Sequence, residues 1–154
     1  MTLPSGTMIK WGVAVLAALF VVAQFIPVDY TNPPVQSDVQ APTQVKSILV
    51  KACFDCHSHE TRWPWYSKIA PVSWWLSGHV RDGRKDLNFS IWPTYNFASQ
   101  ELIMREINKQ VSEQKMPPRS YTVGHPEARL SGDERQILLD WARAGFGDDS
   151  DLFP

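Results

Sequence analysis

The chain has 154 residues, enough for one domain with a short appendage. A hydrophobic content of 44% and a charged content of 20% are ordinary for a folded protein, and a net charge of −1 gives no reason to expect a nucleic-acid partner. The two cysteines are separated by only two residues, which excludes a framework of structural disulfides and points to local chemistry.

An apolar run near the N-terminus extends from Trp11 to Ile26 and is preceded by Lys10. A positive charge before the run, with no acidic residue until Asp29, keeps the N-terminus in the cytoplasm and sends the rest of the chain outward. The run is intermediate in length between a signal-peptide core and a full membrane span, and residues 21–23 offer a cleavage site. We therefore expect residues 1–27 to be a membrane anchor or a signal segment. An anchor keeps the domain at a bacterial inner membrane, facing the periplasm; a cleaved signal releases it into the periplasm.

Residues 28–43 contain three prolines among scattered polar residues. We expect an extended tether, which would reach roughly 50 Å if fully polyproline-like. A linker with no particular role is the alternative. The folded domain is then predicted over residues 44–147, followed by an acidic tail over residues 148–154.

The first half of the domain predicts two helices. One runs from about Gln44 to Phe54, and its apolar stripe continues through both cysteines, which places them on the buried face. The other begins at Pro71, a residue suited to a first helical turn, and carries His79 on its apolar face.

The second half predicts two more helices. One begins with Ser99 as N-cap and ends by about Gln114. The last begins with Ser131, which forms a capping box with Glu134, and stops at Gly145. No stretch alternates as a strand would, so the predicted fold class is all-α, with long loops between short helices.

The motif that carries chemistry is Cys53-Phe54-Asp55-Cys56-His57, the Cys-x-x-Cys-His sequence of c-type haem attachment. Two thiols at this spacing can each form a thioether to a vinyl group of one haem, and the next residue supplies an imidazole to the iron. The prediction is one covalent haem c held by Cys53, Cys56 and His57.

Two other uses of the motif compete with haem. A thioredoxin-like redox pair expects a strand before the cysteines, whereas a helix is predicted here. A zinc site would use Cys53, Cys56, His57 and His59, but known zinc sites draw their ligands from two separated segments.

The second axial iron ligand has two main candidates. Met116 is the first choice, because Pro117 and Pro118 stiffen the loop that follows it. His79 is the alternative, since a buried histidine needs a partner. Met104 is expected to be a packing residue, and His125 a surface or capping residue.

The span from about Val45 to Phe146 resembles the bacterial haem-binding domain family of small c-type cytochromes. The residues that carry the resemblance are Cys53–His57, Trp63–Tyr66, Ala70–Trp74, His79–Val80, Gly83–Arg84, Leu87–Ser90, Trp92, Met116–Pro118, Tyr121, His125–Ala128 and Leu130–Ser131. A looser similarity to class I cytochromes c implies that the first and last helices cross. It also implies a proline carbonyl, here that of Pro71, behind the proximal imidazole.

The function expected from these features is that of a periplasm-facing electron carrier, not an enzyme, whose partners are redox proteins or a membrane oxidoreductase complex. Arg81, Arg84 and Lys85 form a basic cluster that could flank the haem edge or simply be solvated. One alternative is a haem sensor or peroxidase-like enzyme with an open distal site, in which His79 or Arg84 would be the distal polar group. Another is a cytochrome subunit of a membrane electron-transfer complex.

Overall fold

The structure, a computed structural model, describes residues 6–146, and this part of the chain is helical and contains no strand, which confirms the all-α prediction. The chain divides into two compact units. The first unit comprises the described part of Met1–Thr31 together with Trp63–His79, and the second comprises Asn32–Arg62 together with the described part of Val80–Pro154. The predicted acidic tail lies outside the described residues.

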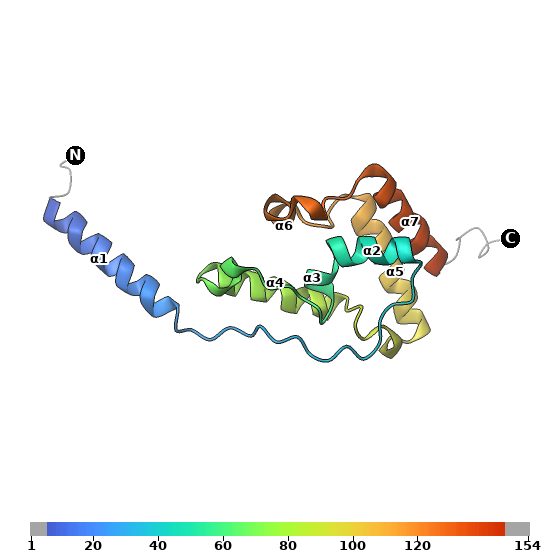
Figure 1. Cartoon of the computed structure of the whole chain (residues 1–154), viewed down its shortest axis with the longest axis horizontal. Helices are drawn as coiled ribbons and strands as arrows, with labels where there is room; N and C mark the ends of the chain where they lie inside the picture. The colour runs from blue at the N-terminus through green and yellow to red at the C-terminus, as the bar shows by residue number, and fades with distance from the viewer. Residues whose placement is uncertain (1–5, 147–154) are drawn as a thin grey trace. The chain divides into compact units, whose positions relative to one another are not determined.

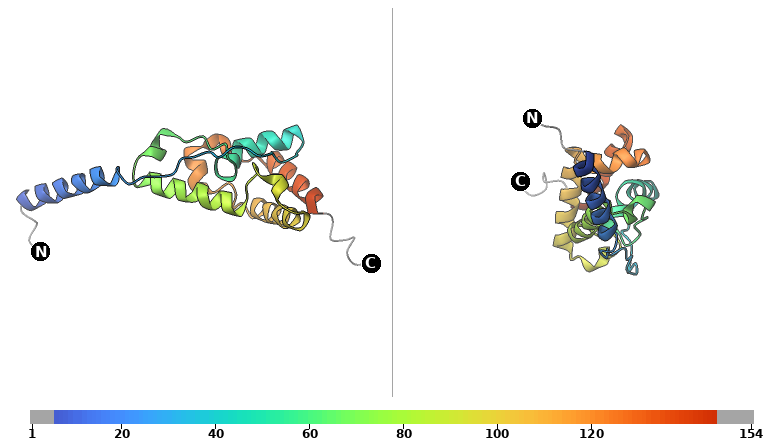
Figure 2. Two further views of the ribbon diagram at one scale, coloured as in Figure 1. Left: turned by 90° about the horizontal axis from the view of Figure 1, so that it is seen from below. Right: turned by 90° about the vertical axis from the view of Figure 1, so that its left-hand side faces the viewer.

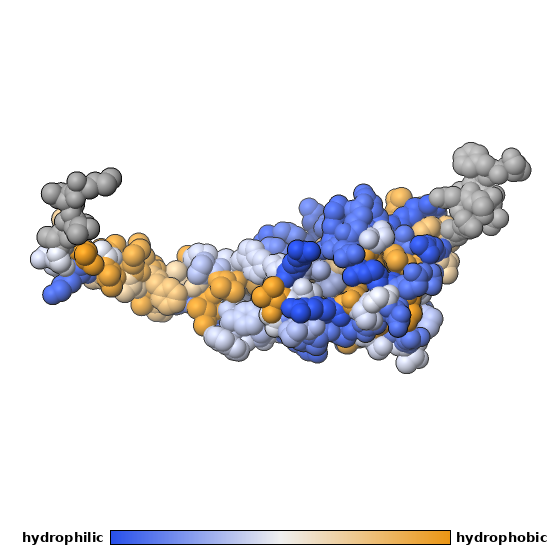
Figure 3. Space-filling view, turned by 90° about the horizontal axis from the view of Figure 1, so that it is seen from above, coloured by the Kyte–Doolittle hydropathy of each residue, from blue (hydrophilic) through white to orange (hydrophobic). Residues whose placement is uncertain are grey.

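The first unit contains α1 (Gly6–Ala23), the short helix η1 (Trp65–Lys68) and the N-terminal half of α4 (Val72–Asp86). None of the eighteen residues of α1 is buried, and the helix is long and apolar enough to cross a membrane or to be a signal sequence. The space-filling view shows its side chains as a band of hydrophobic surface (Figure 3). The predicted apolar N-terminal helix is therefore present.

The second unit holds the remaining helices. They are α2 (Thr43–Ala52), α3 (Phe54–His57), η2 (Trp92–Thr94), α5 (Phe97–Ser112), α6 (Arg119–Gly124), η3 (Pro126–Ala128) and α7 (Gly132–Phe146). Helices α5 and α7 pack side by side, and α2 contacts α7 (Figures 1 and 2). Buried side chains of these three helices form one core together with Phe54 and Phe89; they are Ile48, Leu49, Met104, Val111, Leu138 and Leu139. The burial of Met104 confirms its predicted packing role.

Capping side chains fix where the last two long helices begin. Ser131 Oγ accepts the Glu134 N–H at 3.1 Å and the Glu134 carboxylate accepts the Ser131 N–H at 2.9 Å, so the predicted capping box of α7 is confirmed. The predicted cap of α5 is wrong. The Asn96 side chain accepts the Ser99 N–H at 2.9 Å, and the helix begins at Phe97, two residues before Ser99.

Gly145 lies one residue before the end of α7 and also has a packing role that was not predicted. Helix α7 continues to Phe146, and a Cβ added at Gly145 would lie 2.7 Å from Met104 Cγ. The glycine therefore allows α7 to approach α5 closely, which is a packing requirement that local sequence does not reveal.

The predicted tether is extended but is not free of the domain from Asn32 onward. The Asn32 side chain donates to the Thr61 carbonyl at 2.9 Å, the N–H groups of Gln36 and Ser37 donate to the Ser90 carbonyl, and Val39 is buried in the core. The backbone groups of this stretch are thus partly satisfied by the second unit itself. The full reach of roughly 50 Å expected of a free polyproline-like segment does not apply to it.

Candidate functional site

The predicted attachment motif, Cys53–His57, is here called the attachment turn, and it follows α2 after a break in the backbone. Cys53 has a φ of −125°, and a short helix then restarts at Phe54, with the N–H groups of Cys56 and His57 donating to the Cys53 carbonyl. The predicted uninterrupted helix through Phe54 is therefore wrong at Cys53. Both thiols are free and partly buried, and Cys53 packs against the apolar core.

Burial dominates the acidity of the two thiols. It raises the pKa of Cys53 to about 12 and that of Cys56 to about 11, with the neighbouring Cys56 and Asp55 charges respectively adding to the effect. The attacking cysteine of a thioredoxin-like pair instead has a lowered pKa, because its thiolate is stabilised. The electrostatics of this turn thus disfavour a thiol–disulfide redox pair.

The imidazole of His57 is held from behind by helix α4. Its Nδ1 lies 2.8 Å from the Gly83 carbonyl oxygen and 3.1 Å from that of Leu87. Because a carbonyl can only accept, Nδ1 must carry the proton, and the neutral ring then has its lone pair on Nε2. No described residue hydrogen-bonds to this Nε2. The expectation that Pro71 supplies the orienting carbonyl is wrong.

Gly83 allows α4 to come this close. A Cβ at position 83 would lie 2.8 Å from the backbone oxygen of Cys56, a distance that side-chain carbons essentially never adopt. The glycine is thus a contact point between α4 and the attachment turn, one helical turn before the carbonyl of Leu87.

The arrangement of His59 removes the fourth donor of a zinc site. Its Nδ1 lies 3.0 Å from the Pro34 carbonyl oxygen and its Nε2 lies 2.7 Å from the Asn88 side-chain nitrogen, so both ring nitrogens are used within the fold. Within residues 6–146, no three His, Cys, Asp or Glu side chains are grouped to hold a metal ion. His57 and His59 therefore both carry a proton on Nδ1, but only His57 has an Nε2 that no described residue uses.

Arg84 clamps the loop after the attachment turn. Its Nε donates to the Ser58 carbonyl at 2.8 Å, and its Nη2 donates to Asn32 Oδ1 at 2.6 Å and to Thr61 Oγ1 at 2.9 Å. The prediction that Arg84 is simply solvated is wrong, because these donors are engaged by the loop. Its alternative role as a distal polar group stays a prediction. Arg81 and Lys85 are exposed.

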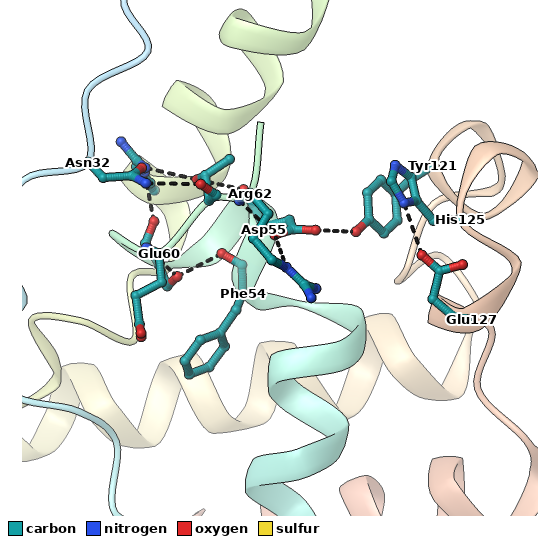
Figure 4. Close-up of polar contacts among 11 residues, drawn as sticks. Asn32, Phe54, Asp55, Glu60, Arg62, Tyr121, His125 and Glu127 are labelled. Carbon is teal, nitrogen blue, oxygen red and sulfur yellow. Dashed lines mark hydrogen bonds and ion pairs between the residues drawn. The ribbon is translucent and has the colours of Figure 1, made fainter. Parts of the chain in front are cut away.

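Asp55, inside the motif, connects the attachment turn to α6 (Figure 4). Its carboxylate accepts the Tyr121 hydroxyl at 2.6 Å and the Arg62 N–H at 3.0 Å. Burial, reinforced by the hydrogen bond to Asp55, raises the pKa of Tyr121, so this phenol stays protonated. The Tyr121 ring stacks on His125 with centroids 4.4 Å apart, and His125 in turn pairs with Glu127.

Met116 lies in the connection between α5 and α6. Its N–H donates to the Gln110 carbonyl at 3.2 Å, Pro118 directly precedes α6, and the side chain is 36% exposed. The backbone of this candidate ligand is thus fixed on both sides, by the end of α5 and by a helix bonded to Asp55. Its role as an iron ligand stays a prediction.

His79 belongs to the first unit, and its side chain is exposed. Its Nδ1 lies 2.8 Å from the Trp75 carbonyl oxygen, and its ring lies 4.2 Å from the Trp75 ring. The expected burial of His79 on an apolar face is wrong, because Val72 and Trp75 on that face are also exposed. Its role as the alternative ligand stays a prediction.

Comparison with known proteins identifies the family. A family model described as "Haem-binding domain" matches residues 18–144. The chain belongs to the haem-binding domain family. No curated protein and no solved structure matches it. The match includes the attachment turn and the Gly83, Arg84 and Tyr121 contacts around it.

The residues present fit a haem. The attachment turn offers two free thiols and an imidazole whose Nε2 is unshared, and these donors suit a haem and its iron. The carbonyls of Gly83 and Leu87 supply the outer support that a metal-binding histidine needs. Sequence reasoning missed this support, since any residue has a carbonyl; the small residue at 83, in a helix, was the signal available.

Proposed function

We propose that this haem-binding protein is a mono-haem c-type cytochrome. Cys53 and Cys56 form the two thioethers, and His57 is the proximal iron ligand. The observation that carries the proposal is the imidazole of His57, whose Nδ1 is hydrogen-bonded by Gly83 and Leu87 and whose Nε2 is left to ligate. The sequence Cys-x-x-Cys-His and the membership of the family support the same conclusion.

The distal ligand in this proposal is Met116. The proline pair after it restricts the backbone, and the bond from Tyr121 to Asp55 ties the following helix to the attachment turn. A loop held at both ends can keep a weakly binding thioether at one position. Methionine with histidine raises the reduction potential relative to two histidines.

Electron transfer is the activity that this ligand set supports. Bound haem supplies one-electron exchange between ferrous and ferric iron, and a site closed by two protein ligands leaves no open position for a substrate. We infer that α1 anchors the chain in the inner membrane and that the domain faces the periplasm, with redox proteins or a membrane oxidoreductase as partners. Lys10, near the N-terminal end of α1, and the absence of burial along the helix support this orientation and anchoring.

Optical spectroscopy of the purified holoprotein and two variants tests the ligand set. The oxidised protein is expected to show a sulfur-to-iron charge-transfer band that is lost in Met116→Ala and kept in His79→Ala. If the band were lost in His79→Ala and kept in Met116→Ala, Met116 would not be the distal ligand.

Carbon monoxide separates a carrier from a sensor or a peroxidase-like enzyme. The closed site is expected to leave the spectrum of the reduced protein unchanged at modest carbon monoxide concentration, whereas Met116→Ala should bind it readily. Rapid binding by the unmodified chain would contradict the carrier function.

A further inference from the structure

The first unit exposes an unusual amount of aromatic surface in one short stretch. The tryptophan segment, Trp63–His79, holds four of the seven tryptophans of the chain. Three of them are exposed, Trp65 at 77%, Trp75 at 48% and Trp74 at 39%, and Ile69 and Val72 beside them are exposed as well. Leaving this much apolar surface in water is unfavourable, so the segment is expected to contact an apolar or amphipathic phase.

This segment is fixed directly to the end of α1. The Gln24 side chain, immediately after the helix, accepts the Ala70 N–H at 3.0 Å. Six residues later the Tyr30 hydroxyl donates to the Ser67 carbonyl at 2.8 Å, and the Tyr30 ring packs edge-on against Trp63 at 5.1 Å between centroids. The tryptophan segment is therefore held beside the point where the chain leaves α1.

The charges of the segment match a lipid headgroup region. It contains one lysine, Lys68, and no acidic residue. Lys68 also lines a hollow of about 350 Å³ beside the turn that follows α1, where it is the only charged residue among the described ones. Tryptophan side chains concentrate at membrane–water interfaces, and lysines there can reach phosphate groups.

We propose that the tryptophan segment lies in the headgroup interface of the membrane in which α1 is anchored, with Trp65, Trp74 and Trp75 facing lipid. The inference rests on the anchor in the proposed function and adds a second membrane contact, made by residues forty positions further along the chain. The bilayer is favoured as the occupant because the segment is hydrogen-bonded to the end of α1, whose apolar side chains are exposed along the whole helix.

A carbene-labelling experiment on the full-length holoprotein tests this contact. The chain is placed in nanodiscs of phosphatidylethanolamine and phosphatidylglycerol that include a phospholipid with a diazirine near the glycerol end of its acyl chain. After photolysis, peptide mass spectrometry locates the adducts. Phe97 in the second unit is the matched control, since it is 80% exposed and apolar like Trp65.

The expected result is adducts on α1 and on the tryptophan segment, their loss from the segment in Trp65→Ser/Trp75→Ser, and none on Phe97. Adducts on α1 alone would overturn the inference and leave the anchor intact. An absence of adducts on α1 would instead refute the anchor. Labelling of Phe97 to the same extent as Trp65 would also overturn the inference, as would protection of the three tryptophans from both lipid carbenes and aqueous hydroxyl radicals.

Discussion

Two adjacent stretches of this chain use their polar and aromatic groups in opposite ways. From Cys53 to Arg62, backbone and side-chain groups are largely satisfied inside the fold, by α4, by the Arg84 clamp and by Tyr121. From Trp63 to His79, large aromatic side chains are exposed while the backbone is bonded to the end of α1. The stretch from Cys53 to Arg62 presents one unshared imidazole nitrogen, whereas the stretch from Trp63 to His79 presents an exposed aromatic surface. The predictions with the largest effects change groups on which that difference depends.

The largest effect is expected from the two histidines of the first stretch, His57 and His59. Of these two, only His57 has an unshared Nε2. In His57→Ala, iron ligation and the c-type spectrum should therefore be lost. His59→Ala should retain both, because its nitrogens already bond Pro34 and Asn88. Absorption spectra of the two variants, expressed with haem-attachment machinery, check the pair. Equal loss of haem in both would show that His59 is not merely structural.

Gly83→Ala tests the close approach of α4 to the attachment turn. The added Cβ would meet the Cys56 oxygen, so we expect a loss of about 2–3 kcal/mol in the free energy of unfolding, together with a weakened hold on His57. Denaturant titration measures the loss of unfolding free energy, and the reduction potential of the bound haem reports the weakened hold on His57.

Gly132→Ala is the control for this change. Nothing lies within 4 Å of a Cβ at Gly132, and its effect should stay below about 1 kcal/mol. Similar stability for the two variants would mean that α4 does not depend on a glycine at position 83.

Tyr121→Phe tests the bond between α6 and the motif. The change removes the donor at 2.6 Å from Asp55, and we expect a loss of about 1.5 kcal/mol in stability. If α6 holds Met116 in place, the sulfur-to-iron band should also weaken. Asp55→Asn, which keeps an acceptor for Tyr121, should lose less of that band. An unchanged band in Tyr121→Phe with the expected loss of stability would limit the contact to a structural role.

The smallest effect concerns Glu134, whose carboxylate pairs with Lys51 and completes the cap of α7. The hydrogen bond from Lys51, followed by that from Ser131, lowers the pKa of Glu134 in the folded chain. The unfolded chain therefore binds this proton first as the pH falls, and the stability from the pair is present above the ordinary carboxyl range and lost below the lowered value.

Glu134→Gln should accordingly cost about 0.5 kcal/mol near neutral pH and close to nothing in acid, because the pair is still partly exposed to solvent. Denaturant titrations of both chains across the acidic range measure the difference. If the loss of unfolding free energy in Glu134→Gln did not change with pH, the loss would come from the helix cap alone and not from the ion pair.

The sequence predicted those features that depend on neighbouring residues. The attachment motif, the capping box at Ser131 and the apolar N-terminal helix follow from local patterns, and the structure bears out the cap and the helix. What it could not predict depends on distant contacts. The carbonyl that orients His57 comes from α4 and not from Pro71, and Gly145 lets α7 pack closely against Met104. Backbone carbonyls and glycine contacts leave little local signature, so these assignments needed the fold.

The mass of the intact chain, purified from the membranes of a host that attaches haem to exported cytochromes, tests the central claim most directly. The account predicts a mass increased by one haem that survives denaturation, with both cysteines unreactive toward alkylation. A chain of unmodified mass whose two thiols alkylate freely, or one whose haem is removed by acid and acetone, would contradict it.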